Sequence, residues 1–516
     1  MKKNTWIEVI TVILVAGFIM LFQLGELPLL DPDEPVYAQT AREMLAANDL
    51  ISPRIFGDFW YDKPPMYYWL VAGAFKVFGQ TEVAARLPSA CLAVFGALMV
   101  YMGGKSIINN RAGFIAALVL STSLEYFYLG KAAVTDVTLT FFITACLLLY
   151  LRKKYYLAYV AAGLAVLTKG PIGIVFPVAI ILIHLILTRN LGSLRYMKIF
   201  SGGALVLAVA LPWYLAMFHF HGMDFVNTFL GFHNVTRFLQ PEHSSGTLWY
   251  YYIPVLLLGF FPWTIFLVQS VWAALQNRDS EQGSELVFFV IWAMVVFAFF
   301  TVSQTKLISY ILPMYPPLAL LVGWYIDRCL TVGTLGIFRK PAVILTILMI
   351  CLEAGLFITA KNSIPDLFPG AVMTGLVFAL ALGAAWFTVR KGRNAEFIGV
   401  LVAGMTAFVI VLMIQLLPAA AQSFSVKALA GQFREHYDGQ APVYIAKFYR
   451  PGFSYYTGTP GRELTTNQQF KELVLSDSGK AYFIIRKTTY LDLPPGEQSK
   501  LQLVATQKDV ALVLKN

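Results

Sequence analysis

The chain has 516 residues, of which 58% are hydrophobic and only 13% carry a charge. Soluble domains carry about 25% charged residues, so this composition excludes an ordinary soluble protein and indicates lipid as the main solvent. The formal net charge of +10 would also suit a nucleic-acid-binding protein, so the positions of the basic residues must decide between the two interpretations.

The N-terminal sequence MKKNTW precedes an apolar run from residue 7 to residue 24, and no small-residue cleavage site follows it. We therefore predict an uncleaved first span rather than a removed signal peptide. Further runs long enough to cross about 30 Å of hydrocarbon lie near residues 84–103, 112–130, 134–151, 155–168, 171–188, 199–219, 249–275, 286–302, 307–326, 342–360, 369–389 and 395–417. The sequence thus predicts thirteen spans.

The basic residues test the orientation of these spans. If Lys2 and Lys3 are cytoplasmic, alternation of the spans places most other basic clusters on the same side, as the positive-inside rule expects. The opposite loops hold mostly one basic residue each, so topology accounts for the net charge and no nucleic acid is expected. The clusters are Lys105/Arg111, Arg152/Lys153/Lys154, Arg189/Arg195/Lys198, Arg278, Arg328/Arg339/Lys340 and Arg390/Lys391/Arg393.

One outer loop departs from this rule, because it mixes charges of both signs at a membrane face. We therefore predict that a transmembrane domain, residues 1–417, carries a catalytic first outer loop, residues 25–83. The charges of this loop lie mainly between Leu30 and Trp69, and they include Asp31, Asp33, Glu34, Arg42, Arg54, Asp58, Asp62 and Lys63.

The composition changes to that of a soluble domain from about Pro418. A helix is expected over residues 425–437, with strands over 442–448, 481–486, 501–506 and 510–514, separated by Gly and Pro. We predict a small α/β domain over residues 418–516. The four cysteines, Cys91, Cys146, Cys329 and Cys351, all lie outside it, in or beside apolar runs, so neither a disulfide framework nor a cysteine zinc site is expected.

Asp33 precedes a helix predicted to begin at Pro35, because proline suits the first helical turn. Tyr37, Ala41 and Met44 share one face, which places this helix along the membrane surface. A single aspartate at this place often only caps the helix. Because a cap leaves the surrounding acids without a role, we interpret the whole cluster as functional.

Asp136 begins the apolar run 137–151 at the outer end of a span, on the side predicted for Asp33. An ionisable residue at membrane depth indicates function by default. The alternative is an N-cap formed by Asp136 or by Thr135, and the sequence leaves both interpretations open.

Two further outer segments carry candidate ligands. The loop HNVTRFLQPEH contains His233, Glu242 and His243, which suit a divalent metal, although their spacing matches no closed metal site and an ordinary surface loop is the alternative. The segment SQTKLISYILPMYPP places Lys306 at the outer membrane face and Tyr310 one turn deeper, where a lipid phosphate would lie. These two residues, and likewise Arg86 before the second span, either bind phosphate or anchor the chain at the interface.

These residues together predict an outward-facing pocket of acids and phosphate-binding cations that is reachable from the bilayer. The chain has no Walker or Rossmann motif, so neither ATP nor a nucleotide sugar nor a nucleotide cofactor is expected. An activated lipid phosphate could supply the energy outside the cytoplasm. A carboxylate could then deprotonate an acceptor hydroxyl while cations or a metal stabilise the departing phosphate.

Seven motifs carry a resemblance to a known family. They are DPDEPVYAQTAREML, WYDKPPMYYW, RLPSA, KAAVTD, LTKGP, RFLQPEH and TKLISYILPMYPP. The chain resembles the polytopic C-type (GT-C) glycosyltransferases over nearly its whole length. Within them it is most similar to the 4-amino-4-deoxy-L-arabinose transferases of lipid A, with the protein mannosyltransferases as a related family.

The resemblance implies transfer of a sugar from an undecaprenyl-phosphate-linked donor to lipid A or another envelope glycan. It implies that Asp33 is the catalytic base and that Asp136 is a second essential acid. Lys63 and Tyr310 match residues that bind the donor phosphate, and Tyr37 matches a tyrosine of the first-loop motif. The full predicted donor-binding set is Lys63, Tyr37, Arg86, Lys306 and Tyr310.

The resemblance also implies a metal site and shows two departures. Asp62 and His243 match ligands of a divalent metal such as zinc, magnesium or manganese. Val36 stands where the aminoarabinose transferases usually carry arginine, and Asp62 stands where they carry glutamate. Both departures concern the sugar and the acceptor more than the reaction.

Two alternatives are retained. One is a polyprenyl-phosphate-mannose-type protein or polysaccharide glycosyltransferase, and the other is a transporter or flippase for a lipid-linked sugar. A transporter should show internal repeats and charges near the bilayer midplane, whereas here no repeat is evident and the charges gather on one face. We therefore predict a monomeric enzyme, multi-pass in the bacterial inner membrane among its lipids, with a cytoplasmic N-terminus and a periplasmic C-terminal domain.

Overall fold

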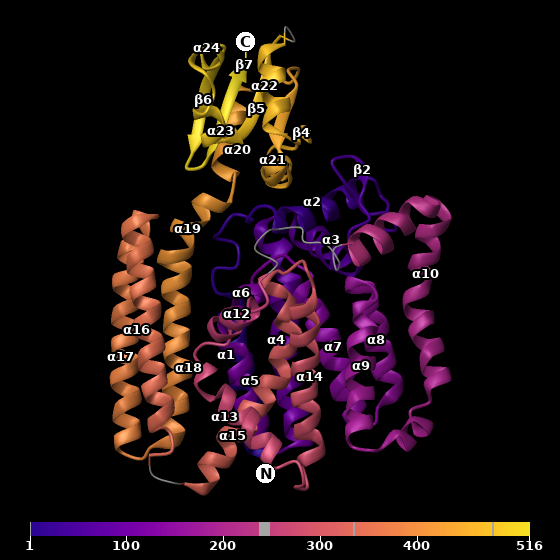
Figure 1. Ribbon diagram of the computed structural model, residues 1–516, viewed down its shortest axis with the longest axis vertical. Coiled ribbons are helices and arrows are strands. Elements are labelled where there is room, and N and C mark those ends of the chain that lie inside the picture. Colours follow the sequence, from indigo (N-terminus) through magenta and orange to yellow (C-terminus); the bar gives the residue numbers. More distant parts are fainter. Residues whose placement is uncertain (1, 237–247, 334–335, 477–478, 516) are drawn as a thin grey trace.

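The computed structural model describes residues 2–236, 248–333, 336–476 and 479–515. Helices form a bundle with a small sheet-containing domain at one end, and the N-terminus lies near the opposite end (Figure 1). The helices α2 (Asp33–Ala46) and α3 (Met66–Phe78) lie between the bundle and the small domain (Figure 1). The predicted combination of an apolar helical part with a C-terminal α/β part is confirmed.

Apolar helices make up the bundle because their side chains are hydrophobic around most of the circumference. In the described part of the chain, six helices are long and apolar enough to cross a membrane, or up to eight if each of two bent helix pairs is one span. The chain is therefore a multi-pass membrane protein. The long helices are α4 (Glu82–Ile107), α10 (Ile199–Val226), α14 (Gly283–Val302), α16 (Arg339–Asn362), α17 (Phe368–Arg390) and α18 (Asn394–Val411), the last continuing through α19 (Leu417–Phe424).

The remaining apolar helices do not each meet these criteria on their own. Each of the thirteen predicted runs coincides with a helix or with a bent pair, although the number of membrane crossings itself stays a prediction. The remaining helices are α1 (Lys2–Leu21), α5 (Asn110–Ser121), α6 (Leu124–Gly130), α7 (Asp136–Leu151), α8 (Tyr155–Lys169), α9 (Ile172–Leu187), α12 (Tyr252–Gly259), α13 (Thr264–Gln276) and α15 (Tyr315–Val332).

Two helix breaks face each other in the core. The axes of α5 and α6 differ by 64°, and those of α12 and α13 differ by 107°. The indole of Trp263, which is fully buried, donates a hydrogen bond to the Thr122 hydroxyl at 2.8 Å, and the Leu124 amide donates to the Phe261 carbonyl at 3.2 Å. Backbone and side-chain polar groups at the two breaks are thus hydrogen-bonded to each other, as polar groups in an apolar interior must be.

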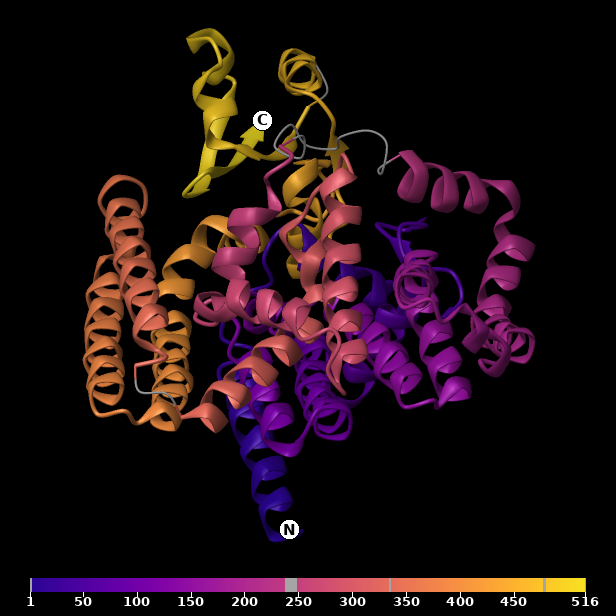
Figure 2. The ribbon, with the colours of Figure 1, turned by 60° about the horizontal axis from the view of Figure 1, so that its bottom comes forward.

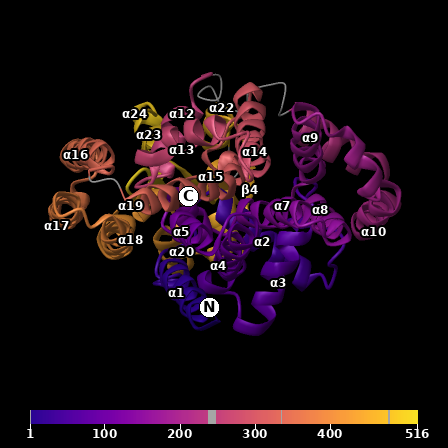
Figure 3. The same ribbon diagram turned by 90° about the horizontal axis from the view of Figure 1, so that it is seen from below.

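The helices are arranged around α4, α5 and α15. Seen from below, α16, α17 and α18 form a group on one side, while α8, α9 and α10 lie on the other side (Figure 3). The first group also stands at the edge of the bundle when the molecule is tilted (Figure 2). Close packing at the centre depends on small residues: a Cβ on Gly113 would lie 2.4 Å from the Lys105 backbone nitrogen.

The end of the bundle near the N-terminus carries the basic loop between α4 and α5. The Lys105 ammonium donates to the Thr5 hydroxyl at 3.0 Å, and the Asn110 amide donates to the Glu8 carboxylate at 2.6 Å. This loop therefore lies at the same end as the N-terminus, as the predicted alternation of spans requires. Which side of the membrane that end faces stays a prediction.

The first loop is more ordered than its sequence indicated. Helix α2 begins at Asp33, two residues before the predicted start at Pro35. It is followed by a short hairpin of β1 (Arg54–Ile55) and β2 (Asp58–Phe59) and then by α3, which the sequence analysis did not predict. Apolar residues of α3 pack against α2 and α4.

The C-terminal domain contains a five-stranded sheet in the order β4-β3-β5-β7-β6. Strand β3 runs parallel to β4 and β5, while β7 runs antiparallel to β5 and β6. The predicted helix and four strands are confirmed, whereas β4, α21 and α22 were not predicted. The elements are α20 (Lys427–His436), β3 (Val443–Ala446), α21 (Arg450–Thr457), β4 (Arg462–Leu464), α22 (Asn467–Leu475), β5 (Ala481–Arg486), β6 (Leu501–Gln507) and β7 (Val510–Lys515).

The contact between α4 and α5 leads to a test of the packing. Gly113→Ala should lower the melting temperature of the detergent-solubilised protein, because overpacking against backbone atoms costs about 1–3 kcal/mol. Gly399→Ala is the matched control, since a Cβ on this glycine of α18 would meet nothing within 4 Å. Equal melting temperatures for the two variants would contradict the close approach.

Candidate active site

Asp33 lies at the first position of α2, at the junction between the bundle and the C-terminal domain. No side chain caps α2, so the capping role that its sequence allowed is not observed. The side chain is exposed, yet burial by the surrounding protein raises the pKa of Asp33 above the ordinary carboxyl value. The neighbouring charge of Asp136 raises this pKa further, while Lys63 lowers it.

Asp136 is the buried partner in a second charged cluster. It begins α7, and the helix has no side-chain cap, so neither Asp136 nor Thr135 acts as one. Its Oδ1 forms an ion pair with the Lys169 ammonium at 2.6 Å, and this ammonium lies 4.5 Å from the centre of the Tyr310 ring. The ends of α7 and α8 and the segment containing Tyr310 thus meet at one point.

Asp62 and Lys63 form a third pair, located just before α3. The Lys63 ammonium lies 2.8 Å from Asp62 Oδ1, and both side chains are largely buried. Because both charges affect the pKa of Asp33, this pair lies within electrostatic range of the carboxylate at the start of α2. The structure therefore brings together four predicted residues, Asp33, Asp62, Lys63 and Asp136.

Tyr37 connects the three segments that carry these charges. Its ring centre lies 5.3 Å from that of Tyr67 and 5.8 Å from that of Tyr68, both on α3. Burial raises the pKa of Tyr37 well above its usual value, and the carboxylates of Asp62 and Asp136 raise it further. Tyr37 is thus a neutral hydroxyl beside the acids, able to donate a hydrogen bond to an anionic group.

A buried ion pair fixes the beginning of α2 against α4. The Arg86 guanidinium contacts the Glu34 carboxylate twice, with Nε–Oε1 at 2.7 Å and Nη2–Oε2 at 2.6 Å. The same carboxylate accepts hydrogen bonds from the Ala133 amide at 2.8 Å and the Leu30 amide at 2.8 Å. Glu34 therefore holds the first loop, α4 and the segment before α7 in one arrangement.

Arg86 has no donor left for the lipid phosphate that was predicted to bind it. Its remaining N–H groups donate to the carbonyls of Leu24, Leu27 and Pro28, at 3.2, 2.7 and 2.7 Å. The five N–H groups of a guanidinium are thereby used within the protein. We correct the predicted role accordingly: Arg86, only 3% exposed, holds the loop in place.

Lys306 lies in the segment between α14 and the short helix that contains Tyr310. Its ammonium donates to the Ser303 carbonyl at 2.7 Å, and the side chain is buried. Burial lowers the pKa of Lys306. Tyr310 extends the Lys169 and Asp136 cluster, as described above, whereas the phosphate contact of Lys306 stays a prediction.

The predicted metal site falls partly outside the described residues. His243 and Glu242 lie in the undescribed segment, and the side chain of His233 is likewise not described. Within the described residues, no group of three or more His, Cys, Asp or Glu side chains could hold a metal ion. Asp62 is moreover paired with Lys63, so these residues alone do not fit a metal, and the divalent ion stays a prediction.

Lys169 and Glu34 are the two residues whose importance the sequence analysis missed. Lys169 entered the sequence analysis only as part of the motif LTKGP. The signal that could have identified it is a lone lysine at the end of an apolar helix, since such a charge needs a partner. Glu34 was counted among the acids of the loop without a role of its own.

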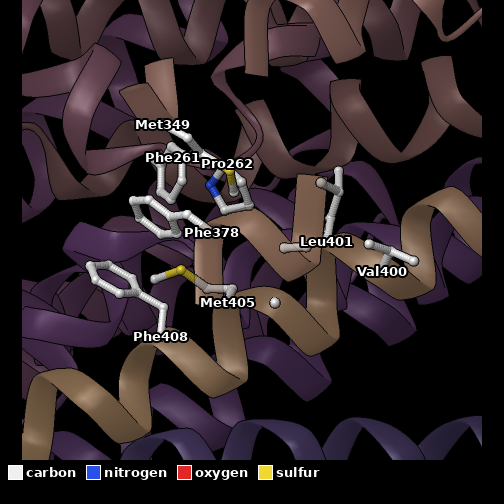
Figure 4. A pocket seen from close by; sticks show the side chains of 10 residues that line it. Phe261, Pro262, Met349, Phe378, Val400, Leu401, Met405 and Phe408 are labelled. Carbon is white, nitrogen blue, oxygen red and sulfur yellow. The ribbon is translucent and has the colours of Figure 1, made fainter. Parts of the chain in front are cut away.

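One cavity lies away from the charged cluster, between the break joining α12 to α13 and the helices α16, α17 and α18. The ten residues that line it are all apolar (Figure 4). Such a lining offers no acid, base or phosphate ligand. This cavity therefore lacks the groups that the predicted chemistry needs, whereas the cluster around Asp33 contains them.

The chain is similar in sequence to a described family and to several known proteins. Residues 62–215 match the family model described as dolichyl-phosphate-mannose-protein mannosyltransferase. The undecaprenyl phosphate-alpha-4-amino-4-deoxy-L-arabinose arabinosyl transferase of Edwardsiella ictaluri is 30% identical over 61% of this chain and 59% of that protein. An uncharacterized protein of Aquifex aeolicus is 30% identical over 59% of this chain and 61% of its own length. The matched part thus spans about three fifths of these relatives.

A solved structure matches nearly the whole chain. It is ArnT from Cupriavidus metallidurans bound to undecaprenyl phosphate, with a TM-score of 0.83 and 21% identity, covering 98% of this chain and 97% of that one. The chain therefore has the fold of that protein. The resemblance to the C-type polytopic glycosyltransferases, predicted from the motifs, is confirmed.

The Glu34–Arg86 pair leads to a stability test. Arg86→Met should lower the free energy of unfolding by about 3–5 kcal/mol, because it leaves a buried carboxylate without its partner. Arg393→Met is the control, since its contact with Glu396 is exposed on both sides, and such pairs contribute little. Thermal unfolding of both variants in detergent provides the measurement, and equal stabilities would contradict the role assigned to Arg86.

Proposed function

We propose that this protein is an inverting glycosyltransferase that uses an undecaprenyl-phosphate-linked sugar as donor. The acceptor is lipid A or another envelope glycan, and the reaction takes place at the periplasmic face of the bacterial inner membrane. The observation that carries the proposal is the meeting of Asp33, Asp136 and Lys63 at one end of an apolar bundle. The relatives named above support the chemical class of the donor.

Asp33 is the general base of the proposed reaction. It removes the proton of an acceptor hydroxyl as that oxygen attacks the anomeric carbon of the donor sugar. The bond between this carbon and the phosphate oxygen breaks, and the polyprenyl phosphate departs with the electron pair. Within the described part of the chain the Asp33 carboxylate has neither an ion pair nor a hydrogen bond, so it is free to accept the proton.

The cations of the cluster stabilise the departing phosphate. Lys63 and Lys169 each form an ion pair with a carboxylate, of Asp62 and Asp136 respectively, and an ammonium is a point charge suited to a phosphate. The hydroxyls of Tyr37 and Tyr310 could donate to the same group. Asp136 then has two roles: it holds Lys169 beside Tyr310, and its negative charge strengthens Asp33 as a base.

A mannosyl donor is the second candidate within the same reaction class. The family model that matches residues 62–215 is named for transfer of mannose from a dolichyl phosphate to protein. Val36, at the place where the aminoarabinose transferases usually carry arginine, is compatible with a different sugar. Both candidates use the same base and the same leaving group, so they differ only in the sugar and the acceptor.

The base assignment can be tested in a strain that lacks the gene. Asp33→Asn should abolish the mass shift that the wild-type protein produces on lipid A or another envelope glycan, because an amide cannot accept the proton. Asp58→Asn is the control, since Asp58 is an exposed acid of the same loop. Mass spectrometry of envelope lipids and glycans provides the measurement, and the observed mass shift identifies the sugar.

Two results of this experiment would contradict the proposal. If Asp33→Asn restores the same modification as the wild type, Asp33 is not the base. If the wild-type protein alters no glycan, yet labelled lipid-linked sugar crosses vesicles that contain it, the protein is a transporter. Transfer of a hexose to protein would instead support the mannosyl alternative.

The electrostatics of the cluster predict a characteristic pH dependence. The base must be deprotonated to act, so kcat/KM should rise with pH as Asp33 loses its proton. Because burial raises the pKa of Asp33, the midpoint of this rise should lie above the usual aspartate pKa of about 3.9. Asp136→Asn removes a negative neighbour and should move this midpoint to lower pH. Lys63→Met removes a positive neighbour and should move it to higher pH. Shifts in the same direction would contradict the assignment.

A further inference from the structure

Asp31, two residues before Asp33, connects the first loop to the C-terminal domain. Its Oδ1 accepts a hydrogen bond from the Gly452 amide at 2.9 Å, and its Oδ2 accepts one from the Val426 amide at 3.2 Å. Its own amide donates to the Phe424 carbonyl at 2.8 Å. The side chain is only 8% exposed, so these contacts satisfy a carboxylate that is nearly removed from water.

The two amides that Asp31 contacts belong to helix N-termini. Val426 immediately precedes α20, and Gly452 is the third residue of α21. The unsatisfied N–H groups and the dipole of a helix N-terminus both favour a negative charge, so one carboxylate stabilises two helices at once. A residue with a side chain would not fit at position 452, because its Cβ would lie 2.2 Å from Asp31 Oδ1.

Arg42 makes the complementary contact at the other end of α21. Its guanidinium donates to the carbonyls of Ser454 and Tyr455 at 3.0 and 2.8 Å, and it lies 4.8 Å from the centre of the Tyr455 ring. A cation at a helix C-terminus is favourable for the same electrostatic reason that an anion is favourable at the N-terminus. Asp31 and Arg42 therefore contact opposite ends of α21.

We propose that the C-terminal domain is a working part of the transfer site, and that Asp31 and Arg42 are positioning residues through which α21 sets the place of Asp33. The inference rests on the proposed function for its effect on activity. The Glu34–Arg86 pair holds α2 from the side of the membrane helices, and Asp31 holds the same end from the opposite side. With both contacts in place, the first turn of α2 has one position.

The proposal explains why such specific contacts join the two parts of the chain. A base must lie within hydrogen-bonding distance of the acceptor hydroxyl, and a displacement of about 1 Å can reduce a rate about 100-fold. Since only Pro32 separates Asp31 from Asp33, any shift of Asp31 is transmitted to the base. The contact that docks the C-terminal domain therefore also sets the position of the base.

Two substitutions disturb this contact in different ways. Asp31→Asn keeps the size of the side chain. Its amide nitrogen, however, is a donor and would face one of the two backbone N–H groups that donate to the carboxylate. Gly452→Ala leaves the Asp31 carboxyl group chemically unchanged and displaces it with a methyl group. Gly431→Ala is the matched control, because a Cβ on this exposed glycine of α20 would meet nothing within 4 Å.

The experiment uses the full-length protein in nanodiscs with two independent measurements. Amide hydrogen exchange should increase in α2, at residues 35–46, and in α21 for Asp31→Asn and Gly452→Ala but not for Gly431→Ala. Transfer assays should show kcat reduced about tenfold to 100-fold, with the KM for the lipid donor unchanged. Gly452→Ala should also shift the acid limb of the pH profile, because Asp33 then lies at a different distance from Asp136 and Lys63.

A double variant separates this contact from general destabilisation. If both substitutions act through one contact, Asp31→Ala combined with Gly452→Ala should be no worse than Asp31→Ala alone. Unchanged exchange in α2 would overturn the proposal whatever the activity. Increased exchange in α21 with wild-type kcat and pH profile would also overturn it, since the domain would then only dock. A wild-type protein that transfers no sugar would instead contradict the proposed function, while the exchange data would still decide whether Asp31 positions α2.

Discussion

The buried pair of Glu34 and Arg86 is the contact on which the rest of the site depends. Desolvating two charges is costly, and the cost is offset only where the geometry is good and the remaining polar atoms are satisfied. Here both carboxylate oxygens and all five guanidinium N–H groups have partners. Because no other register of α2 would preserve these contacts, the neighbouring Asp33 is held at a defined place relative to α4 and α7.

The charges around Asp33 differ in how they are neutralised. Asp62 has Lys63 as its partner, and Asp136 has Lys169. Asp33 lies close enough to both carboxylates for each to raise its pKa, and it takes part in neither pair. The paired carboxylates of Asp62 and Asp136 therefore raise the pKa of Asp33 and make it more basic. Shifted pKa values of this kind are common at functional sites.

The sequence was sufficient for features that depend on local pattern. Hydrophobic runs located the apolar helices, and mixed charge in an outer loop identified the segment that contains Asp33. The roles of Arg86 and Lys169 could not be obtained in the same way, because they depend on contacts with Glu34 and Asp136, which are 52 and 33 residues distant. Helix α3 was missed since its start at Met66 follows two prolines in a segment interpreted as loop. Arg86 before an apolar run fits both an anchor and a phosphate ligand, and only its five partners decide between them.

In the proposed reaction, different parts of the chain serve the donor phosphate and the base. Membrane helices α7 and α8 position Asp136 and Lys169, with Tyr310 beside them, where a lipid phosphate would arrive from the bilayer. Asp33 comes from a surface helix that contacts both the bundle and the C-terminal domain. On this proposal, the residues expected to meet the leaving group belong to the apolar bundle, while the proposed base lies on a helix held by contacts with two domains.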